Sequence, residues 1–412
     1  MLATPRLPFV LLLLAAAPAA QSGSAIVVDH TSTRLPEVPA AGIDQAKANL
    51  HIAYGHTSHG SQITTGMEGL VGFTGGCGGP QFAWNNGGTN GALDLDDYAM
   101  PGDLTYFPQW VDETRAYLND PKNADVNVVL WAWCESLTWY TTDDLRDRYI
   151  VPMVQLELDY PWVRFVYMTG HVDVRHKANV EARNQEIRTF CRNFGKVLYD
   201  FADIESYDPD GRYFAYADED CSYYARNGTT LLGNWAIAWQ DSHVLGVDWY
   251  QCAALHSQPL NANRKAYAAW WLWARLAGWP GRPELAVSTD GLSAATGGTA
   301  DFALAAGPTH ANRLYLLLGS LTGTGPGTPL PGTSAVLPLN WDFFTDASLQ
   351  GSYGPPFAGF LGVLDANGAA AATFALPALP PAADYLSIHF AYLLPAVPPR
   401  LVSNAVAVRI VQ

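Results

Sequence analysis

The chain has few basic residues and few cysteines for its length, and both shortages exclude classes of function. Among its 412 residues, 23 are Lys or Arg and 38 are Asp or Glu, so the formal net charge is −15 at pH 7. Nucleic acids and anionic membranes bind basic surfaces, so the sequence predicts neither as a partner. The five cysteines include no Cys-x-x-Cys pair, which argues against a cysteine-based zinc site. Because five is odd, at least one thiol should be free or pair elsewhere.

Long hydrophobic runs are also scarce, and the N-terminus carries only a short one. Arg6 precedes an apolar core at Phe9–Leu14, and small residues follow, which is the pattern of a secretory signal peptide over residues 1–20. This core is too short to span a bilayer, and no later run is long enough. We therefore predict a secreted or periplasmic protein without a membrane span. Export permits disulfides, and Cys221 with Cys252 is the pair we expect to be bridged.

Composition divides the rest of the chain into two predicted domains, residues 21–280 and 284–412. The first is rich in aromatic residues, and the break Pro280–Pro283 separates it from a part that is poor in charge. That second part has short apolar runs between Gly and Pro turns, which predicts an all-β sandwich, an accessory domain of the kind found in secreted bacterial proteins. It shows no cluster of chemically active residues, and its isolated His310 and His389 are interpreted as structural.

The first domain alternates continuous apolar runs with helical periodicity. Such runs are typical of strands buried on both faces. Strands that alternate with helices predict an α/β fold, a doubly wound and mostly parallel sheet with helices on both faces. In such sheets the functional site lies at the carboxyl ends of the strands. The predicted strands after the first are Asn127–Trp133, Val163–Thr169 and Val197–Phe201, and the predicted helices cover 142–158, 178–194 and 261–278.

The stretch His51–Leu70, HIAYGHTSHGSQITTGMEGL, joins the first predicted strand to a helix through a polar turn. The apolar run ends at Gly55, the turn reads His-Thr-Ser-His, and helical spacing begins at Ser61. A strand, a sharp turn with a hydroxyl and a helix can present a nucleophile above a sheet, and the first helical N–H groups suit a developing oxyanion. Ser58 is therefore a candidate nucleophile. The alternative is that a hydroxyl of this turn only caps the helix.

Polar residues follow the other predicted strands as well, and a histidine precedes the last helix. Glu135 follows the second strand, whereas His171 and Asp173 follow the third. His256 lies just before the last helix, where a base would face Ser58.

On these positions, Ser58 in GHTSHG and His256 in ALHSQPLNANRKAYAAW, the chain resembles the SGNH/GDSL hydrolase superfamily of secreted lipases and carbohydrate esterases. The similarity covers roughly residues 50–278. It implies a Ser58 nucleophile, a His256 base, no cofactor and an acylated polysaccharide as substrate. The Gly-Asp-Ser motif and the oxyanion asparagine of that superfamily are absent, and Ala253 stands where it has an aspartate.

The absent aspartate leaves the third catalytic residue to be chosen from nearby carboxylates. We predict that Asp248 orients His256, with Glu135 as the second choice, and that Gly88 or Gly91 supplies a backbone oxyanion donor. The residues predicted to bind substrate are His56, His59, Gly88, Glu135, His171 and Asp173.

Three other readings of the same residues stay open. His56 and His59, spaced His-x-x-His, could bind zinc together with His171 and activate water. In a polysaccharide lyase, Arg175 and Arg183 could neutralise a uronate carboxylate while a histidine abstracts the neighbouring proton. A non-catalytic carbohydrate-binding protein would use the many loop aromatics, and the serine of the turn would only be a cap.

Overall fold

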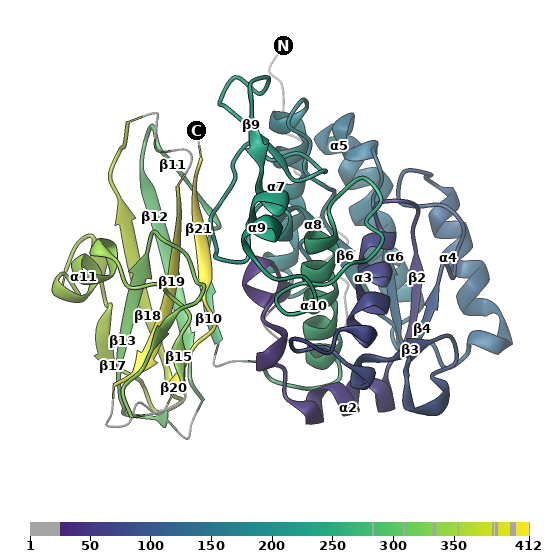
Figure 1. Ribbon diagram of the computed structural model, residues 1–412, viewed down its shortest axis with the longest axis horizontal. Coiled ribbons are helices and arrows are strands. Elements are labelled where there is room, and N and C mark those ends of the chain that lie inside the picture. The colour runs from purple at the N-terminus through teal and green to yellow at the C-terminus, as the bar shows by residue number, and fades with distance from the viewer. Residues whose placement is uncertain are drawn as a thin grey trace, which may run out of the picture.

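The computed structural model describes residues 25–281, 284–307, 310–332, 335–352, 354–380, 383, 386–395 and 401–411. An α/β part and a β part lie side by side (Figure 1). The last helix of the first part, α10, ends at Leu276, and the first strand of the second, β10, begins at Glu284. The predicted signal peptide, residues 1–20, lies outside the described residues.

A seven-stranded sheet forms the centre of the α/β part, and each pair of neighbouring strands is parallel. Its order is β1-β7-β6-β5-β2-β4-β3. Numbered along the chain, the five strands between the two edges run 2-1-3-4-5, the order of flavodoxin-like doubly wound sheets. The strands are β1 (Ile26–Val28), β2 (His51–Gly55), β3 (Trp84–Asn85), β4 (Leu93–Asp97), β5 (Val128–Trp131), β6 (Arg164–Met168) and β7 (Val197–Tyr199).

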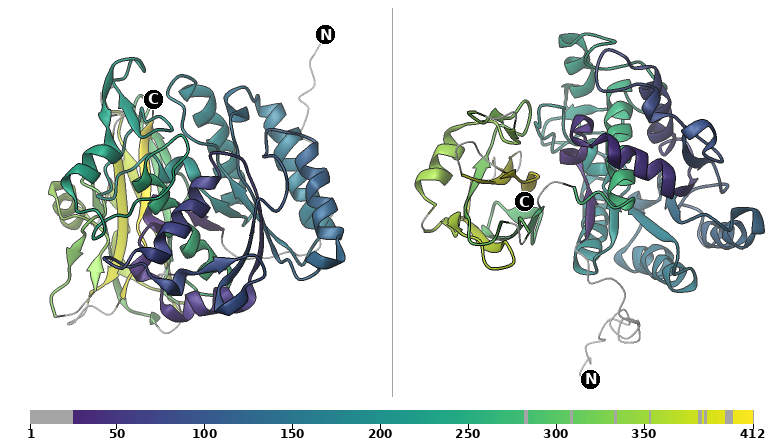
Figure 2. Two further views of the ribbon diagram at one scale, coloured as in Figure 1. Left: turned by 45° about the vertical axis from the view of Figure 1, so that its right-hand side comes forward. Right: turned by 90° about the horizontal axis from the view of Figure 1, so that it is seen from below.

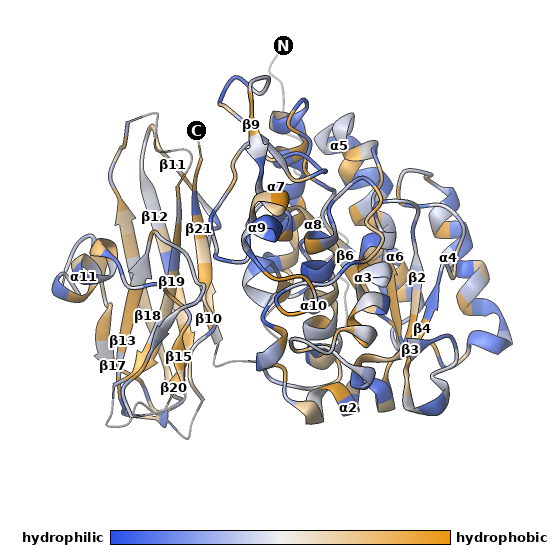
Figure 3. Ribbon diagram, viewed as in Figure 1, coloured by the Kyte–Doolittle hydropathy of each residue, from blue (hydrophilic) through white to orange (hydrophobic). Residues whose placement is uncertain are grey.

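Helices cover both faces of this sheet, as right-handed crossovers require (Figure 2). On one face α10 (Pro259–Leu276) packs against both α2 (Ala40–Asn49) and α3 (Ser61–Gly72). The strands under them are largely hydrophobic, whereas the outer helix α4 carries hydrophilic turns (Figure 3). The other face carries α4 (Gln109–Asn119), α5 (Thr142–Leu145), α6 (Val151–Asp159) and α7 (Lys177–Asn193). The α/β prediction is confirmed at this level.

The central helix α10 begins earlier than the sequence predicts. The sequence predicts a start at residue 261, but the helix starts at Pro259, with Gln258 as the N-cap. Proline has a backbone angle suited to the first helical turn and lacks only an N–H that would stay unpaired there. Asn261 is instead fully buried, and its side-chain amide donates to the Ser257 hydroxyl.

The β part contains two larger sheets that share one apolar core, and a two-stranded sheet of β14 (Thr328–Pro329) and β15 (Val336–Leu337). The orders of the two larger sheets are β10-β12-β18-β16 and β11-β21-β19-β13-β17, with β20 paired to β19. All these pairs are antiparallel except β11 with β21. The strands are β10 (Glu284–Val287), β11 (Gly291–Ser293), β12 (Gly298–Ala305), β13 (Leu314–Ser320), β16 (Phe357–Ala358), β17 (Leu361–Val363), β18 (Ala369–Leu376), β19 (Ser387–Leu394), β20 (Leu401–Val402) and β21 (Val406–Val411), with the short helix α11 (Phe343–Gln350).

Buried polar contacts join the two parts. Nε2 of His389, on β19, lies 2.8 Å from Nε2 of His30 in the α/β part. The His30 ring stacks on Tyr207 at 3.4 Å, and its Nδ1 bonds Asp203. His389, which the sequence left isolated, is therefore one half of a buried histidine pair between the two parts.

This histidine pair predicts a loss of stability in mild acid. Burial lowers the pKa of His389 well below its ordinary value of 6.5, so the unfolded chain takes up a proton that the folded chain excludes. The free energy of unfolding should therefore fall as pH drops below about 6.5, by up to about 1.4 kcal/mol per pH unit. Denaturant titrations at pH 5 and pH 7.5 would measure this. His389→Phe should flatten the dependence, and His310→Gln is the control; an equally steep dependence in both variants would contradict the prediction.

Candidate active site

The candidate active site lies at the carboxyl ends of β2, β5 and β6. The chain leaves the sheet in opposite directions from β2 and β5, and a ligand crevice in doubly wound sheets opens at such a point. Gly55 at the end of β2 pairs with Trp131 at the end of β5, so the loops that follow emerge side by side. Ser58 Oγ from one loop consequently lies 3.9 Å from Cys134 Sγ of the other.

Three histidine rings are stacked beside this pair. The His59 ring lies between His171, at 4.2 Å between ring centroids, and His256, at 4.5 Å, with nearly parallel planes. Glu219 Oε2 lies 2.6 Å from His59 Nε2 and 3.6 Å from His171 Nδ1. A ring nitrogen of His256 also lies within 4.8 Å of the carboxylate. One carboxylate therefore lies close to all three rings.

The protonation states of these groups follow from burial and from the short contacts. Burial lowers the pKa of His59, and the hydrogen bond from His59 lowers the pKa of Glu219. A neutral imidazole that donates Nε2–H to a carboxylate satisfies both shifts. Its Nδ1 is then an acceptor, and the Cys134 Sγ lies 3.4 Å away. Since burial raises the pKa of Cys134, that group is a thiol and donates to Nδ1.

The turn that carries Ser58 is held from several sides. The Ser61 hydroxyl donates to the Ser58 carbonyl at 2.7 Å, and the Thr57 hydroxyl donates to Asp103 at 2.5 Å. In the described part of the chain, the backbone N–H groups of His59 and Gly60 have no hydrogen-bond acceptor. They are the free donors at the start of α3 and suit an anion at this turn.

A buried ion pair ties together the loops behind the site. Lys265 of α10, which is fully buried, donates to Glu205 at 2.8 Å and to Gln62 at 2.5 Å. Glu205 also accepts the N–H of Val172, next to His171, at 2.5 Å. Gln62 donates to the carbonyl of Leu255, next to His256, at 2.6 Å. The network thus fixes the backbone beside two of the stacked histidines.

Replacing Lys265 with methionine should destabilise the protein strongly. The substitution keeps most of the side-chain volume but leaves the Glu205 carboxylate buried and without its cation, which costs about 3–5 kcal/mol. Urea denaturation followed by tryptophan fluorescence would measure the loss. The double variant Lys265→Met with Glu205→Gln should recover part of it, because the uncompensated charge is gone. A single variant as stable as the wild type would show that the pair does not hold the loops.

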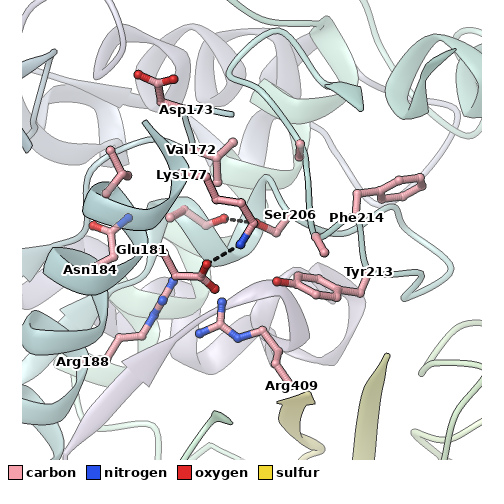
Figure 4. A pocket seen from close by; sticks show the side chains of 14 residues that line it. Val172, Asp173, Lys177, Glu181, Asn184, Arg188, Ser206, Tyr213, Phe214 and Arg409 are labelled. Atoms are coloured by element: carbon pink, nitrogen blue, oxygen red, sulfur yellow. Dashed lines mark hydrogen bonds and ion pairs between the residues drawn. The ribbon is translucent and has the colours of Figure 1, made fainter. Parts of the chain in front are cut away.

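A small cavity lies behind the loop after β6, next to the β part (Figure 4). Its volume is about 40 Å³, so it holds little more than water. Figure 4 shows Glu181, Arg188 and Arg409 turned toward one another inside it, and Lys177 paired with Glu181. His256, in contrast, is exposed, so the stack is accessible from solvent at that residue.

Two of the predicted substrate-binding residues belong to other contacts. His56 Nε2 lies 2.7 Å from Asp97, and its ring packs on Tyr54 and Tyr98. The predicted zinc set of His56 with His59 and His171 is therefore not assembled. Asp173 accepts from His176 Nδ1 at 2.7 Å, which ties it to the start of α7.

The predicted third residue and oxyanion donor are not brought to the stack. Asp248 is exposed, and its carboxylate accepts the N–H of Val244 in its own loop at 2.8 Å. Within the described residues, no hydrogen bond or ion pair joins Asp248 to His256. Gly88 lies beside Asp94, which pairs with His51, the first residue of β2. It is therefore near the amino end of β2, whereas the histidine stack is at the carboxyl ends of the strands. Glu135 does lie next to Cys134 but is exposed, and Gly91 shares the loop of Gly88.

Sequence reasoning missed Glu219 and gave Cys134 no role. Glu219 lies in the long loop between α8 (Phe201–Ile204) and β8 (Ser222–Tyr224), and the only signal was the acidic run of residues 218–220. The predicted disulfide was wrong, because all five cysteines are free. Cys221 Sγ lies 3.4 Å from the Ser257 hydroxyl, and Cys252 Sγ lies 3.4 Å from the Asn263 amide.

No protein-family model and no curated protein sequence matches the chain.

None of the described helices has the length and hydrophobicity needed to cross a membrane.

Proposed function

We propose that this chain is a secreted, SGNH-like hydrolase that removes acyl groups from a carbohydrate, with Ser58 as nucleophile and His256 as general base. The observation that carries the proposal is the assembly of Glu219 and three histidine rings beside Ser58 at the carboxyl edge of the sheet. Glu219 takes the place of Asp248 as the proposed acid: it bonds His59, whose ring stacks on His256, and its charge would stabilise the His256 imidazolium. A nucleophile, a base and an orienting acid at one strand edge are what acyl transfer requires.

His256 is the histidine best placed to accept the proton of the nucleophile. Both nitrogens of His59 are already engaged, one by Glu219 and the other by Cys134. His256 is exposed, and within the described residues its ring makes no hydrogen bond. Its φ of 64° lies in the left-handed region, a strained conformation that clusters at functional sites. Hydrogen bonds between nucleophile and base are often long without substrate and tighten on binding.

Ser58 suits this base better than Cys134 does. A nucleophilic cysteine reacts as the thiolate, whereas burial raises the pKa of Cys134. A serine instead reacts as its proton moves to a neutral imidazole. In the proposed reaction the Ser58 oxygen bonds to the ester carbonyl carbon while His256 takes its proton. The alcohol then leaves with that proton, and water cleaves the acyl-enzyme by the same route. The N–H groups of His59 and Gly60 would bind the oxyanion.

Exposed aromatic rings on the loops near Ser58 support a carbohydrate as the substrate. Tyr98, directly after β4, is 55% exposed, and Tyr106 is 54% exposed. Tyr106 belongs to the loop whose Asp103 bonds Thr57. Trp139, in the loop after Cys134, is 74% exposed. Flat rings with one apolar face in water suit the apolar face of a sugar, and Tyr and Trp are enriched at such interfaces.

The decisive experiment is labelling of the mature protein with a fluorophosphonate, followed by peptide mapping. We expect one adduct, on Ser58, that is lost in His256→Ala and retained in Ser257→Ala, the neighbouring serine. An adduct that persists in His256→Ala, or one on another residue, would contradict the proposed pair. A protein that takes no adduct but binds glycans on an array would instead be the non-catalytic carbohydrate-binding protein.

A further inference from the structure

We propose that His59, Glu219 and His256 together bind a divalent transition-metal ion, zinc above all, at the mouth of the candidate active site. One ligand atom from each residue lies within 4.8 Å of the other two. Two imidazoles and one carboxylate are a known donor set for zinc, and three protein ligands leave the fourth tetrahedral position open to solvent. Imidazole nitrogen also favours zinc, copper or nickel over magnesium and calcium, which prefer oxygen.

The three ligand atoms lie close enough to converge on one ion if the His256 ring turns out of its stack on His59. Ligands about 2.0–2.1 Å from a tetrahedral zinc lie roughly 3.3 Å from each other. His59 Nε2 and Glu219 Oε2 are now 2.6 Å apart, with a proton between them, so they must separate slightly. The Glu219 side chain is 34% exposed, and His256 is exposed on its loop, so both have room to adjust and the ion can reach them from solvent.

The contacts around these ligands are those that hold a metal site in shape. Metal-binding histidines usually pass the hydrogen of their second nitrogen to a neighbouring group, which fixes the ring. The second nitrogen of His59 faces Cys134 Sγ at 3.4 Å, and this sulfur can accept that hydrogen once Nε2 binds the ion. On the side of His59 away from His256, the His171 ring stacks on His59 and donates through Nδ1 to the Val172 carbonyl at 2.8 Å.

Two other groups of acidic and histidine residues in the described part of the chain are poorer zinc sites. Each contains a single histidine. In the first group both nitrogens of His30 are already bonded, to Asp203 and to His389, and the ring is buried. The second, around His51, sits at the amino end of β2 with an Asp125 side chain that is 63% exposed. It therefore supplies a matched control on the same protein.

Metal binding would also regulate the site, and this part of the inference rests on the proposed function. A zinc ion on His256 takes the lone pair that the base needs for the proton of Ser58. Zinc should therefore inhibit ester hydrolysis reversibly, and a chelator should restore the activity.

The test measures bound metal directly. Mature protein is stripped with a chelator, dialysed against zinc chloride and analysed for zinc by mass spectrometry. We expect Glu219→Gln and His256→Ala each to bind zinc at least about tenfold more weakly than the wild type, and Asp125→Asn to bind it as the wild type does. A wild type that binds no zinc, or Glu219→Gln and His256→Ala proteins that bind as much, would overturn the proposal. Circular dichroism confirms the fold of each variant, and His256→Ala, at an exposed position, guards against a misfolded Glu219→Gln.

Ser58→Ala separates the two proposals, because it leaves all three ligands in place. It should bind zinc normally and hydrolyse no ester. If it binds zinc and the protein never hydrolyses esters, the proposed function fails and the metal site stands. If the wild type hydrolyses esters but takes up no zinc, the metal site fails and the function stands.

Discussion

Replacing Ser58 with alanine should lower kcat/KM for ester hydrolysis by about 10⁴-fold or more, because removal of the nucleophile leaves only binding and oxyanion stabilisation. The fold should survive the change. Ser58 is partly exposed, and among the described residues its hydroxyl contacts only Cys134 Sγ, at 3.9 Å. Initial rates with p-nitrophenyl acetate, together with thermal unfolding of both proteins, would separate loss of chemistry from loss of structure.

Cys134→Ala is the matched variant for this experiment. It removes the neighbour of Ser58 and the thiol that bonds His59, yet it keeps the proposed nucleophile, base and acid. Its rate should stay within about tenfold of the wild type, the size of effect expected from losing an outer contact. The reverse result, an inactive Cys134→Ala and an active Ser58→Ala, would make the thiol the nucleophile.

The second large effect is expected for Glu219→Gln, which should reduce kcat by about 10⁴-fold. The amide has nearly the shape of the carboxylate but carries no charge to stabilise the imidazolium that forms during attack. Its amide oxygen can still accept the His59 Nε2–H, so the variant removes the negative charge and can keep this hydrogen bond. Rates at saturating substrate would measure the change.

Asp248→Asn is the control for that result, because Asp248 is the carboxylate that sequence alone selected. Its structural role is a contact within an exposed loop, so the variant should keep wild-type rates. If Asp248→Asn were inactive and Glu219→Gln active, the loops would have to rearrange on substrate binding, and the assignment of the acid would fall.

The strands that the sequence predicted are those whose residues are buried on both faces. All four residues of β5 are buried, and such runs stand out in any sequence. The missed strand β4 reads Leu-Asp-Leu-Asp-Asp; its leucines are buried, and its acidic side chains, which are partly exposed, bond His51, His56 and Tyr117. An alternation of apolar and acidic residues over only five positions cannot be told from a polar loop. The strand β1 was also missed, and it has only three residues.

Candidate site residues were predictable where a strand or the last helix positions them, as with His256 just before α10. Ser58, His59 and His171 follow β2 and β6 directly, so their meeting at one edge follows from the parallel sheet. Glu219 lies on a loop whose sequence has no helical or strand periodicity. Its position depends on contacts such as the hydrogen bond that the Val174 N–H donates to Asp218. Asp248 was chosen for its nearness to His256 along the chain, which does not imply nearness in space.

We expect the polar contacts between the two parts to make them unfold as one cooperative unit. Asp290, at the start of the β part, pairs with Arg409 of β21 at 3.0 Å and also faces Arg188 of α7. Truncation at the linker would leave Arg188 and His30 on a freshly exposed surface, each stripped of one partner. The C-terminal part is thus not a detachable tail. Through Arg188, the C-terminal part also contacts α7, the helix that follows the loop carrying His171.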